Sequence, residues 1–386
     1  MKTTIFETKK TYICLSIATL VCVTLATIIS KGNLFSVLFF SDTQDTGMDF
    51  FNSLVSVHTK KPYEDFHSLY PPFANLFFYA LQLFIPNSIK TTWPHTHMDT
   101  VFMVGTEQDL RLRQSSLLVF LFFIIITLFC FYFIFQSIFR KTLLSICLTA
   151  SFGVIYAIER GNVILITFLL LFFFIKNYKS DNKIIHELSL LSLAMAFGFK
   201  LYPAIFGLLL LKDRMFFSAV RSAFYAILIN IASLFFFEGF SGIPQWLDIL
   251  SIRSSDLSQT PASSPITFRL VSIIICMLIL LLDLFFENRI HIHLFASQRL
   301  FIISWLMLLI IGGNDIYNLI YFLIPFVYFL QEEYTLNKYN LIEFLLYLYC
   351  LLPLGINTFE PVYFLFFLFG ASLRIWNNRR AVLLNQ

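Results

Sequence analysis

Long apolar runs are the feature that most limits what this chain can fold into. Runs of about 15 to 25 residues recur along its whole length, for example at 115–139, 216–238 and 267–286, and a helix needs about 20 apolar residues to cross the hydrocarbon of a bilayer. The runs lack the short alternating pattern of a membrane β-barrel. Only 13% of the 386 residues are charged, about half the share in soluble domains. The sequence therefore predicts an all-α polytopic membrane protein.

The Lys and Arg residues between the runs predict the orientation of the chain. The first run, 12–40, is too long for a signal peptide, and we expect it to be an uncleaved first helix. About twelve runs then cross the membrane. With the N-terminus inside, nearly all basic loops become cytoplasmic; they are 140–141, 176–183, 212–214, 287–299, 332–338 and 374–380. The prediction is a multi-pass protein of the cell membrane with both termini cytoplasmic.

One further apolar segment, residues 70–86, does not fit this count. If it crossed, every later basic loop would face outside, so we interpret it as a re-entrant or interfacial helix. The alternative is that a weaker segment within 87–114 also crosses. The chain is then a single integral membrane domain over 1–386, with a first outer loop at 41–114 and a second at 239–266. The second outer loop either contacts an acceptor or is a solvated linker.

The first outer loop begins with an acidic stretch, SDTQDTGMDFFNSL, at residues 41–54. We predict a helix over 49–57 with two unlike sides. Its apolar side lies in lipid or against other helices; the residues are Phe50, Phe51, Leu54, Val55 and Val57. Its polar side holds Asp49, Asn52, Ser53 and Ser56. Asp49 either caps the helix or faces a ligand at the boundary between water and lipid.

Two cations depart from the positive-inside rule in this orientation. Arg160, in the turn ERGN at 159–162, and Lys200, in FKLYP at 199–203, both follow apolar runs that end outside. Lys200 reaches towards lipid phosphate or holds an anionic ligand, and Arg160 pairs locally with Glu159 or holds the same ligand. Together with Asp49 they suggest a site for an anionic substrate.

Cysteine, metal and nucleic-acid signatures are weak in this sequence. The six cysteines all fall inside apolar runs and none forms a CxxC pair, which indicates buried small apolar residues. The net charge of +4 is small, and no nucleic-acid partner is expected. The partners we expect are membrane lipids.

Several segments together resemble glycosyltransferase family 87, a group of membrane mannosyltransferase-like enzymes with the GT-C fold. They are MDFFNSL, KKPYEDFHSLYPPFANLFF, a Gly-Asn turn and KLYPAIFGLLLLKDR, within about residues 45–215. Lys61 stands where the family often has Gly before Pro-Tyr, and the turn Arg160-Gly161-Asn162 lacks the usual Gln. The resemblance implies a GT-C-like fold of about twelve transmembrane helices, and it implies sugar transfer in the synthesis of cell-envelope polysaccharides.

The resemblance also implies roles for single residues. Asp49 would be the catalytic base of an inverting transfer from a polyprenyl-phosphate sugar to a glycan or lipid acceptor outside the cell. Arg160 or Lys200 would stabilise the departing phosphate, and Asp45 would bind sugar hydroxyls, as would Asp42. Further substrate contacts would come from Glu159, Asn162, Tyr70 and Tyr202. Phosphate is a good leaving group, so no cofactor is expected; the alternative is a metal held by Asp42, Asp45 and Asp49.

Two other functions are compatible with such a sequence. A transporter or flippase would also have many helices, but it would show inverted repeats and charges near the middle of the bilayer, and neither stands out here. A polymerase or ligase acting on polyprenyl-linked sugars would concentrate Arg in a large late outer loop. The segment 239–266 contains a single arginine, Arg253, which argues mildly against that class.

Overall fold

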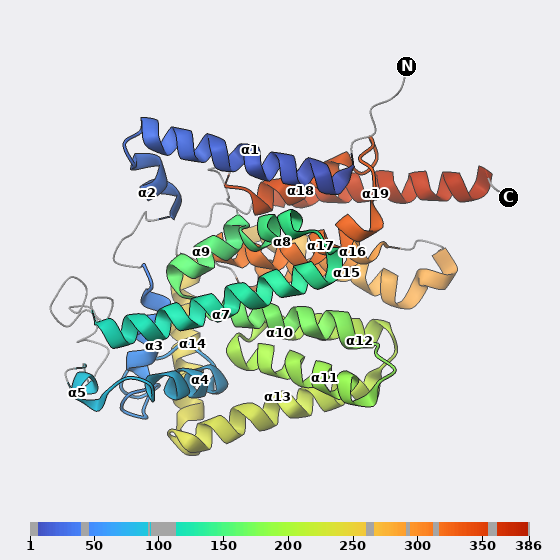
Figure 1. The fold of residues 1–386 in the computed structure, drawn as a ribbon. Coiled ribbons are helices and arrows are strands. Elements are labelled where there is room, and N and C mark those ends of the chain that lie inside the picture. The colour runs from blue at the N-terminus through green and yellow to red at the C-terminus, as the bar shows by residue number, and fades with distance from the viewer. Residues whose placement is uncertain are drawn as a thin grey trace. The chain divides into compact units, whose positions relative to one another are not determined.

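Helices form nearly all of the regular secondary structure among the residues that the structure describes. This computed structural model describes residues 7–39, 46–91, 93, 113–259, 266–290, 294–311, 316–353 and 361–384 (Figure 1). Within these ranges the one β-type contact is an isolated bridge between Glu7 and Thr335. The predicted all-α class is therefore confirmed.

Two compact units make up the chain. The first contains residues 1–41, 132–156 and 261–386, and the second contains 42–131 and 157–260. The boundary falls inside two helices, α7 (Gln114–Phe139) and α9 (Phe152–Arg160).

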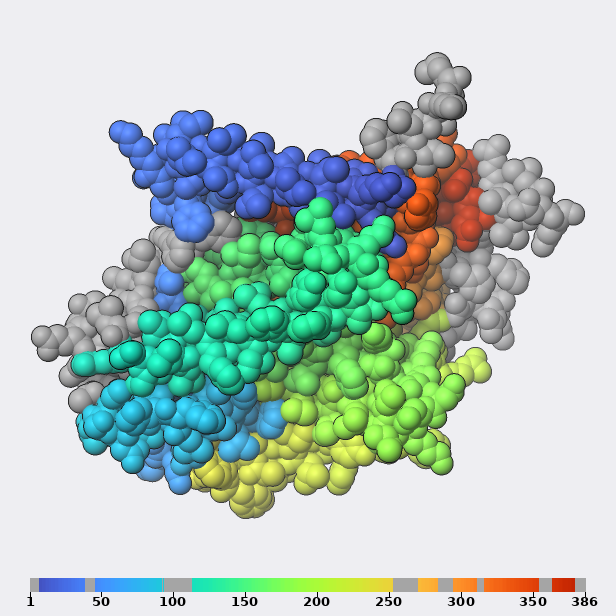
Figure 2. All heavy atoms as spheres, in the orientation of Figure 1, coloured from blue at the N-terminus to red at the C-terminus, as the bar shows by residue number. Residues whose placement is uncertain are grey.

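The first unit contains the N-terminal helix and the C-terminal third of the chain. Its helices are α1 (Thr8–Ile29), α2 (Asn33–Phe39), α8 (Thr142–Thr149), α15 (Ile266–Ile290), α16 (Ala296–Ile311), η4 (Ile316–Phe322), α17 (Leu323–Glu332), α18 (Leu341–Leu351) and α19 (Pro361–Leu384). Figure 2 shows α1 as a row of blue side chains at the surface. Its Leu20, Ile28 and Ile29 are 66%, 67% and 81% exposed, as expected of a helix that lipid covers.

A buried ion network ties the last helices of this unit together. Arg374 of α19 pairs with Glu332, Glu333 and Glu343 at distances of 2.6 to 3.0 Å. Its guanidinium also lies 3.8 Å from the ring centre of Phe295. Three carboxylates around one arginine are held in place because each accepts hydrogen bonds from several donors. The network therefore fixes the end of α17 and the first turn of α18 to the middle of α19.

The second unit holds every described residue of the predicted site. Its helices are α3 (Met48–Ser56), α4 (Pro72–Gln82), α5 (Asn87–Lys90), α10 (Ile164–Asn177), α11 (Lys183–Phe199), η2 (Tyr202–Gly207), α12 (Leu208–Lys212), α13 (Phe216–Phe236), η3 (Gly239–Ser241) and α14 (Gly242–Gln259). Helix α11 packs between α10 and α13, and α4 packs on α11 and α13. This stack supports the loops that carry the site.

Helices long and apolar enough to cross a membrane are fewer than the predicted twelve. Within the described ranges three qualify: α1, α7 and α13. Helices α8 and α9 together qualify as a fourth, bent by 49° at the break between them. The remaining apolar helices are shorter, from 10 to 17 residues. The chain is thus a membrane protein with three or four candidate spans.

Several predicted segments correspond to observed helices. The helix expected over 49–57 is α3, and its apolar side packs against protein: Phe50 contacts the rings of Phe78, Phe120 and Phe123. The segment 70–86 contains α4, which starts at Pro72 as the Pro-Pro pair predicts. The segment 239–266 is largely the helix α14, so its described part is not an extended linker.

Candidate functional site

Asp49 lies on the first turn of α3 and is bound by two residues from a distant turn. Its Oδ1 lies 3.0 Å from Nη2 of Arg160, and its Oδ2 accepts a hydrogen bond of 2.8 Å from Nδ2 of Asn162. Nε of Arg160 donates to Oδ2 at 3.4 Å. Two-point contact of this kind fixes the plane of a carboxylate. Both charged side chains remain 20% exposed, so a ligand can reach them.

The turn that carries Arg160 and Asn162 has a defined local cause. Helix α9 ends in a Schellman motif, because N–H of Asn162 bonds to the carbonyl of Ala157 and N–H of Gly161 bonds to that of Ile158. Gly161 has φ +67°, and a Cβ there would lie 2.7 Å from Cβ of Phe50. Only glycine fits both the backbone and the space.

Asn162 performs two tasks in this turn. Its Oδ1 accepts from the N–H of Ile164, the first residue of α10. Its Nδ2 is thereby directed at Asp49. The side chain is almost completely buried, at 1% exposure, so both bonds are shielded from water.

Glu159 holds the preceding loop in place. Its carboxylate accepts a hydrogen bond of 2.6 Å from Oγ1 of Thr46, and its backbone carbonyl accepts one of 2.7 Å from N–H of Gly47. Gly47 has φ +72° and precedes the first turn of α3. The predicted substrate-binding residue Glu159 thus contacts the chain immediately before Asp49.

Lys200 and Tyr70 form the other half of the site. Helix α11 ends at Phe199, and Lys200 follows it with an extended backbone. The Nζ of Lys200 lies 4.6 Å from the ring centre of Tyr70. A close helix contact brings them together: a Cβ on Gly198 would lie 2.9 Å from Cβ of Phe73. Phe199 also packs edge-on against Phe73 and Phe77 of α4.

The hydroxyl of Tyr70 lies within electrostatic range of Asp49 and Arg160. Burial raises the pKa of Tyr70 well above its ordinary value of 10, and the negative charge of Asp49 and the neighbouring Tyr202 raise it further, while Arg160 and Ser53 act in the opposite direction. Tyr70 therefore stays a neutral hydroxyl near Asp49. Its carbonyl accepts from the hydroxyl of Tyr63 at 3.0 Å, which holds the loop before α4.

The structure places most of the predicted site residues in one region of the second unit. Asp49, Arg160 and Asn162 bind one another, Lys200 and Tyr70 are in contact, and Tyr202 is within electrostatic range of Tyr70; Glu159 holds the loop before Asp49. Asp45 and Asp42 lie outside the described residues. Sequence reasoning gave no packing role to Gly161 and missed Gly198 and Tyr63, although a glycine within two residues of each cation is a signal of close packing.

Ser53 and Ser56 differ from the predicted polar side of α3. They are 4% and 8% exposed, because their hydroxyls bond to carbonyls within the helix, Ser53 to Asp49 and Ser56 to Ser53. A serine that satisfies its own hydroxyl in this way can be buried. The solvent-facing residues of α3 are therefore Asp49 and Asn52.

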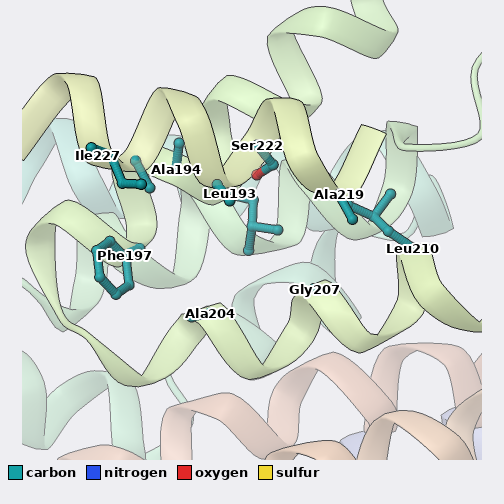
Figure 3. Close-up of a pocket in the computed structure, with 11 residues that line it drawn as sticks. Leu193, Ala194, Phe197, Ala204, Gly207, Leu210, Ala219, Ser222 and Ile227 are labelled. Atoms are coloured by element: carbon teal, nitrogen blue, oxygen red, sulfur yellow. The ribbon is translucent and has the colours of Figure 1, made fainter. Parts of the chain in front are cut away.

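An apolar pocket of about 250 Å³ lies between α11, η2, α12 and α13 (Figure 3). Small or aliphatic side chains line it, among them Ala194, Ala204, Gly207, Ala219 and Leu210. Two of its lining residues flank Lys200 in sequence. Phe197 lies in the last turn of α11, before Lys200, and Ala204 follows Lys200 in η2. The pocket lining therefore comes from segments of the chain on both sides of Lys200.

No protein-family model, curated protein or solved structure matches the chain. The fold itself defines a class: an all-helical membrane protein with three or four candidate spans and a polar site on the loops between its helices.

Proposed function

We propose that this chain is a membrane glycosyltransferase of the GT-C type. It would transfer a sugar from a polyprenyl-phosphate donor to a glycan or lipid acceptor on the extracytoplasmic face, with inversion at the anomeric carbon. The observation that carries the proposal is the convergence of Asp49 with Arg160 and Asn162, more than a hundred residues later in the chain, next to Lys200 on Tyr70.

Asp49 is the base in this mechanism. Its carboxylate takes the proton of an acceptor hydroxyl while that oxygen bonds to the anomeric carbon of the donor sugar, and the bond from that carbon to the phosphate oxygen breaks. A positioned base typically contributes about 10²- to 10⁴-fold to the rate. Asn162 fixes the carboxylate, and Asp49 is partly exposed, so an acceptor can approach it.

The two cations serve the leaving group. Negative charge grows on the polyprenyl phosphate as the bond to the sugar breaks, and fixed cations in a partly dry site stabilise that charge. Arg160 is the nearer to Asp49, and its planar guanidinium suits both a carboxylate and a phosphate. Lys200 is held over the ring of Tyr70, within the same region.

The apolar pocket supports a lipid-linked donor. Its lining includes Phe197, three residues before Lys200, and Ala204, four residues after it. A phosphate at Lys200 would leave an isoprenoid tail next to this lining, where burial is favourable by about 25 cal/mol per Å² of apolar surface. The donor class thus accounts for a cation and an apolar pocket in adjacent positions.

The proposed topology has about twelve crossings, more than the three or four long helices supply. Short apolar helices would supply the others in consecutive groups, such as η2 with α12, and η4 with α17. A 14-residue helix such as α10 is about 21 Å long, which is short of a full crossing of about 30 Å. Breaks in such helices are tolerated where neighbouring protein covers the backbone.

The test supplies membranes with radiolabelled polyprenyl-phosphate sugars and asks which label reaches a larger glycan or lipid product. Wild type should transfer one of them. Asp49→Asn should lose transfer by at least about 100-fold at unchanged expression and membrane insertion, and Asp181→Asn, the same change at an exposed aspartate, should not. Near-normal transfer by Asp49→Asn would refute the base. Movement of label across the membrane without transfer would favour a flippase.

A further inference from the structure

A second polar cluster lies where α13 ends and α14 begins. Glu238, just after α13, accepts hydrogen bonds at Oε1 from the backbone N–H groups of Tyr63 and Glu64, at 3.0 and 3.1 Å. This carboxylate therefore fastens the end of α13 to the loop before α4. Its other oxygen, Oε2, takes no part in these two hydrogen bonds.

Three polar atoms in this cluster are shielded from solvent and have no hydrogen-bond partner among the described residues. They are Oε2 of Glu238, Oε1 of Gln245 and Nε1 of Trp246. A buried polar atom without a partner costs about 1–3 kcal/mol, and such atoms are rare in folded proteins. Three of them within residues 238–246 call for a functional explanation.

The first turn of α14 links the three residues. Oε2 of Glu238 is 3.1 Å from the position that a Cβ on Gly242 would occupy. Gln245 and Trp246 follow Gly242 by three and four residues in α14, which is the spacing of neighbours on a helix surface. The ring centre of Trp246 is 6.2 Å from that of Tyr63, which places this face against the loop.

The chemistry of the cluster matches a sugar ring. A carboxylate oxygen and an amide oxygen accept hydrogen bonds from hydroxyl groups, and an indole N–H donates one. The rings of Trp246 and Tyr63 offer apolar faces with a polar edge, which suit the C–H face of a pyranose. A purely apolar ligand would leave the polar atoms unsatisfied.

We infer that this cluster is a subsite for a sugar residue of the acceptor glycan. The inference rests on the proposed function, and it adds the acceptor side to it. The hydroxyl of Tyr63 bonds to the carbonyl of Tyr70, whose ring carries Lys200. The cluster and the Asp49 site are thus joined through one short loop, as a donor side and an acceptor side require.

The first experiment measures binding without a donor. Purified full-length protein in lipid nanodiscs is titrated with neutral oligosaccharides of mannose, glucose or N-acetylglucosamine, and affinity is read by calorimetry. We expect one series to bind. Trp246→Phe, which removes the N–H and keeps a ring, and Glu238→Gln, which keeps an oxygen for the loop, should each weaken binding by roughly tenfold. Trp376→Phe, at an exposed tryptophan of α19, should not.

The second experiment separates acceptor from donor. In the transfer assay the two variants should raise KM for the acceptor and leave KM for the donor and kcat unchanged. Unchanged acceptor KM in both variants, a rise in donor KM alone, or no binding of any oligosaccharide would overturn the subsite. Those results would leave the proposed function standing if Asp49→Asn still abolishes transfer. Absence of transfer by the wild type with every donor would instead refute the proposed function. Calorimetry would still test sugar binding by the cluster in that case.

Discussion

Nδ2 of Asn162 lies 2.8 Å from Oδ2 of Asp49, and the oxygen of the same amide group accepts from the N–H of Ile164, the first residue of α10. One buried side chain therefore binds both the first residue of a helix and a carboxylate. Loss of this residue should affect stability and activity together.

Asn162→Ala tests this double role, with Asn182→Ala as its control. Asn182 also accepts hydrogen bonds from backbone N–H groups at the start of a helix, since it is the N-cap of α11 and binds Ile184 and Ile185, but it is exposed and has no contact with Asp49. We expect the control to cost about 1 kcal/mol and to leave transfer intact. Asn162→Ala should cost a further 1.5–3 kcal/mol or so, because it also removes a hydrogen bond to a charged group, and it should reduce transfer. Thermal unfolding and the transfer assay check this, and equal effects of the two changes would contradict it.

Gly161→Ala should be more damaging than Gly239→Ala. Both glycines have positive φ, +67° and +64°, so an alanine at either position costs about 1–2 kcal/mol of backbone strain. A Cβ on Gly161 would also meet Phe50 and Phe120, whereas one on Gly239 meets nothing within 4 Å. We expect a difference of about 1–3 kcal/mol from this overpacking, measured as the shift in unfolding temperature in detergent. Similar shifts would mean that α3 yields to the added methyl group.

Gly198→Ala should lower both stability and transfer, because α4 would have to move away from the end of α11. The nearest atoms to an added Cβ are Cβ and Cδ1 of Phe73, at 2.9 Å, and such overpacking costs about 1–3 kcal/mol. Gly207→Ala is the matched control, since its nearest neighbour is a methyl group of Leu193 at 3.8 Å. That change should stabilise the protein by about 0.4–1 kcal/mol. A harmless Gly198→Ala would show that the contact between Lys200 and Tyr70 does not depend on this packing.

Glu238 should make stability depend on pH in the acid-to-neutral range. Burial raises the pKa of its carboxyl above 4.5, although the N–H groups of Glu64 and Tyr63 favour the ionised form. Below pH 4.5 the carboxyl is protonated in both the folded and the unfolded chain, so it does not lower the free energy of unfolding. As pH rises through 4.5 the folded state alone retains the proton, so stability falls until the folded carboxyl has ionised too.

Glu238→Gln removes this dependence and keeps an oxygen for the loop. Its unfolding temperature should therefore fall less than that of wild type when pH is raised from about 4 to about 8. Asp248→Asn, at an exposed carboxyl of α14, should follow wild type. Parallel curves for wild type and Glu238→Gln would show that the carboxyl is not perturbed in the folded protein.

The proposed orientation is tested by cysteine labelling. The six native cysteines are replaced first, and single cysteines are then introduced at two exposed positions, Asp248 in α14 and Asp181 between α10 and α11. A membrane-impermeant maleimide should label Asp248→Cys in intact cells, and it should label Asp181→Cys only after permeabilisation. Reversed labelling would place the Asp49 site in the cytoplasm and rule out an extracytoplasmic donor.

The sequence predicted the helical class and the start of α4, because apolar run length and a Pro-Pro pair act locally. It also predicted that Asp49, Arg160 and Lys200 would share a site, from their exceptional positions relative to the apolar runs. It did not predict that Arg160 and Asn162 bind Asp49 directly, or that Tyr70 lies under Lys200. Those contacts depend on how closely helices approach, which is set by single glycines at 161 and 198 rather than by any periodic pattern.

The span of 111 residues between Asp49 and Arg160 has a consequence for how the protein is made. Helix α3 leaves the ribosome well before the end of α9 exists, so during synthesis its carboxylate waits beside the bilayer without its arginine. The hairpin of α10 and α11, by contrast, closes as soon as it is made, because its partners are neighbours in the chain. Asp49 therefore pairs with Arg160 only after α9 has been made, and slowing translation between α5 and α9 would prolong the interval in which its carboxylate has no arginine partner.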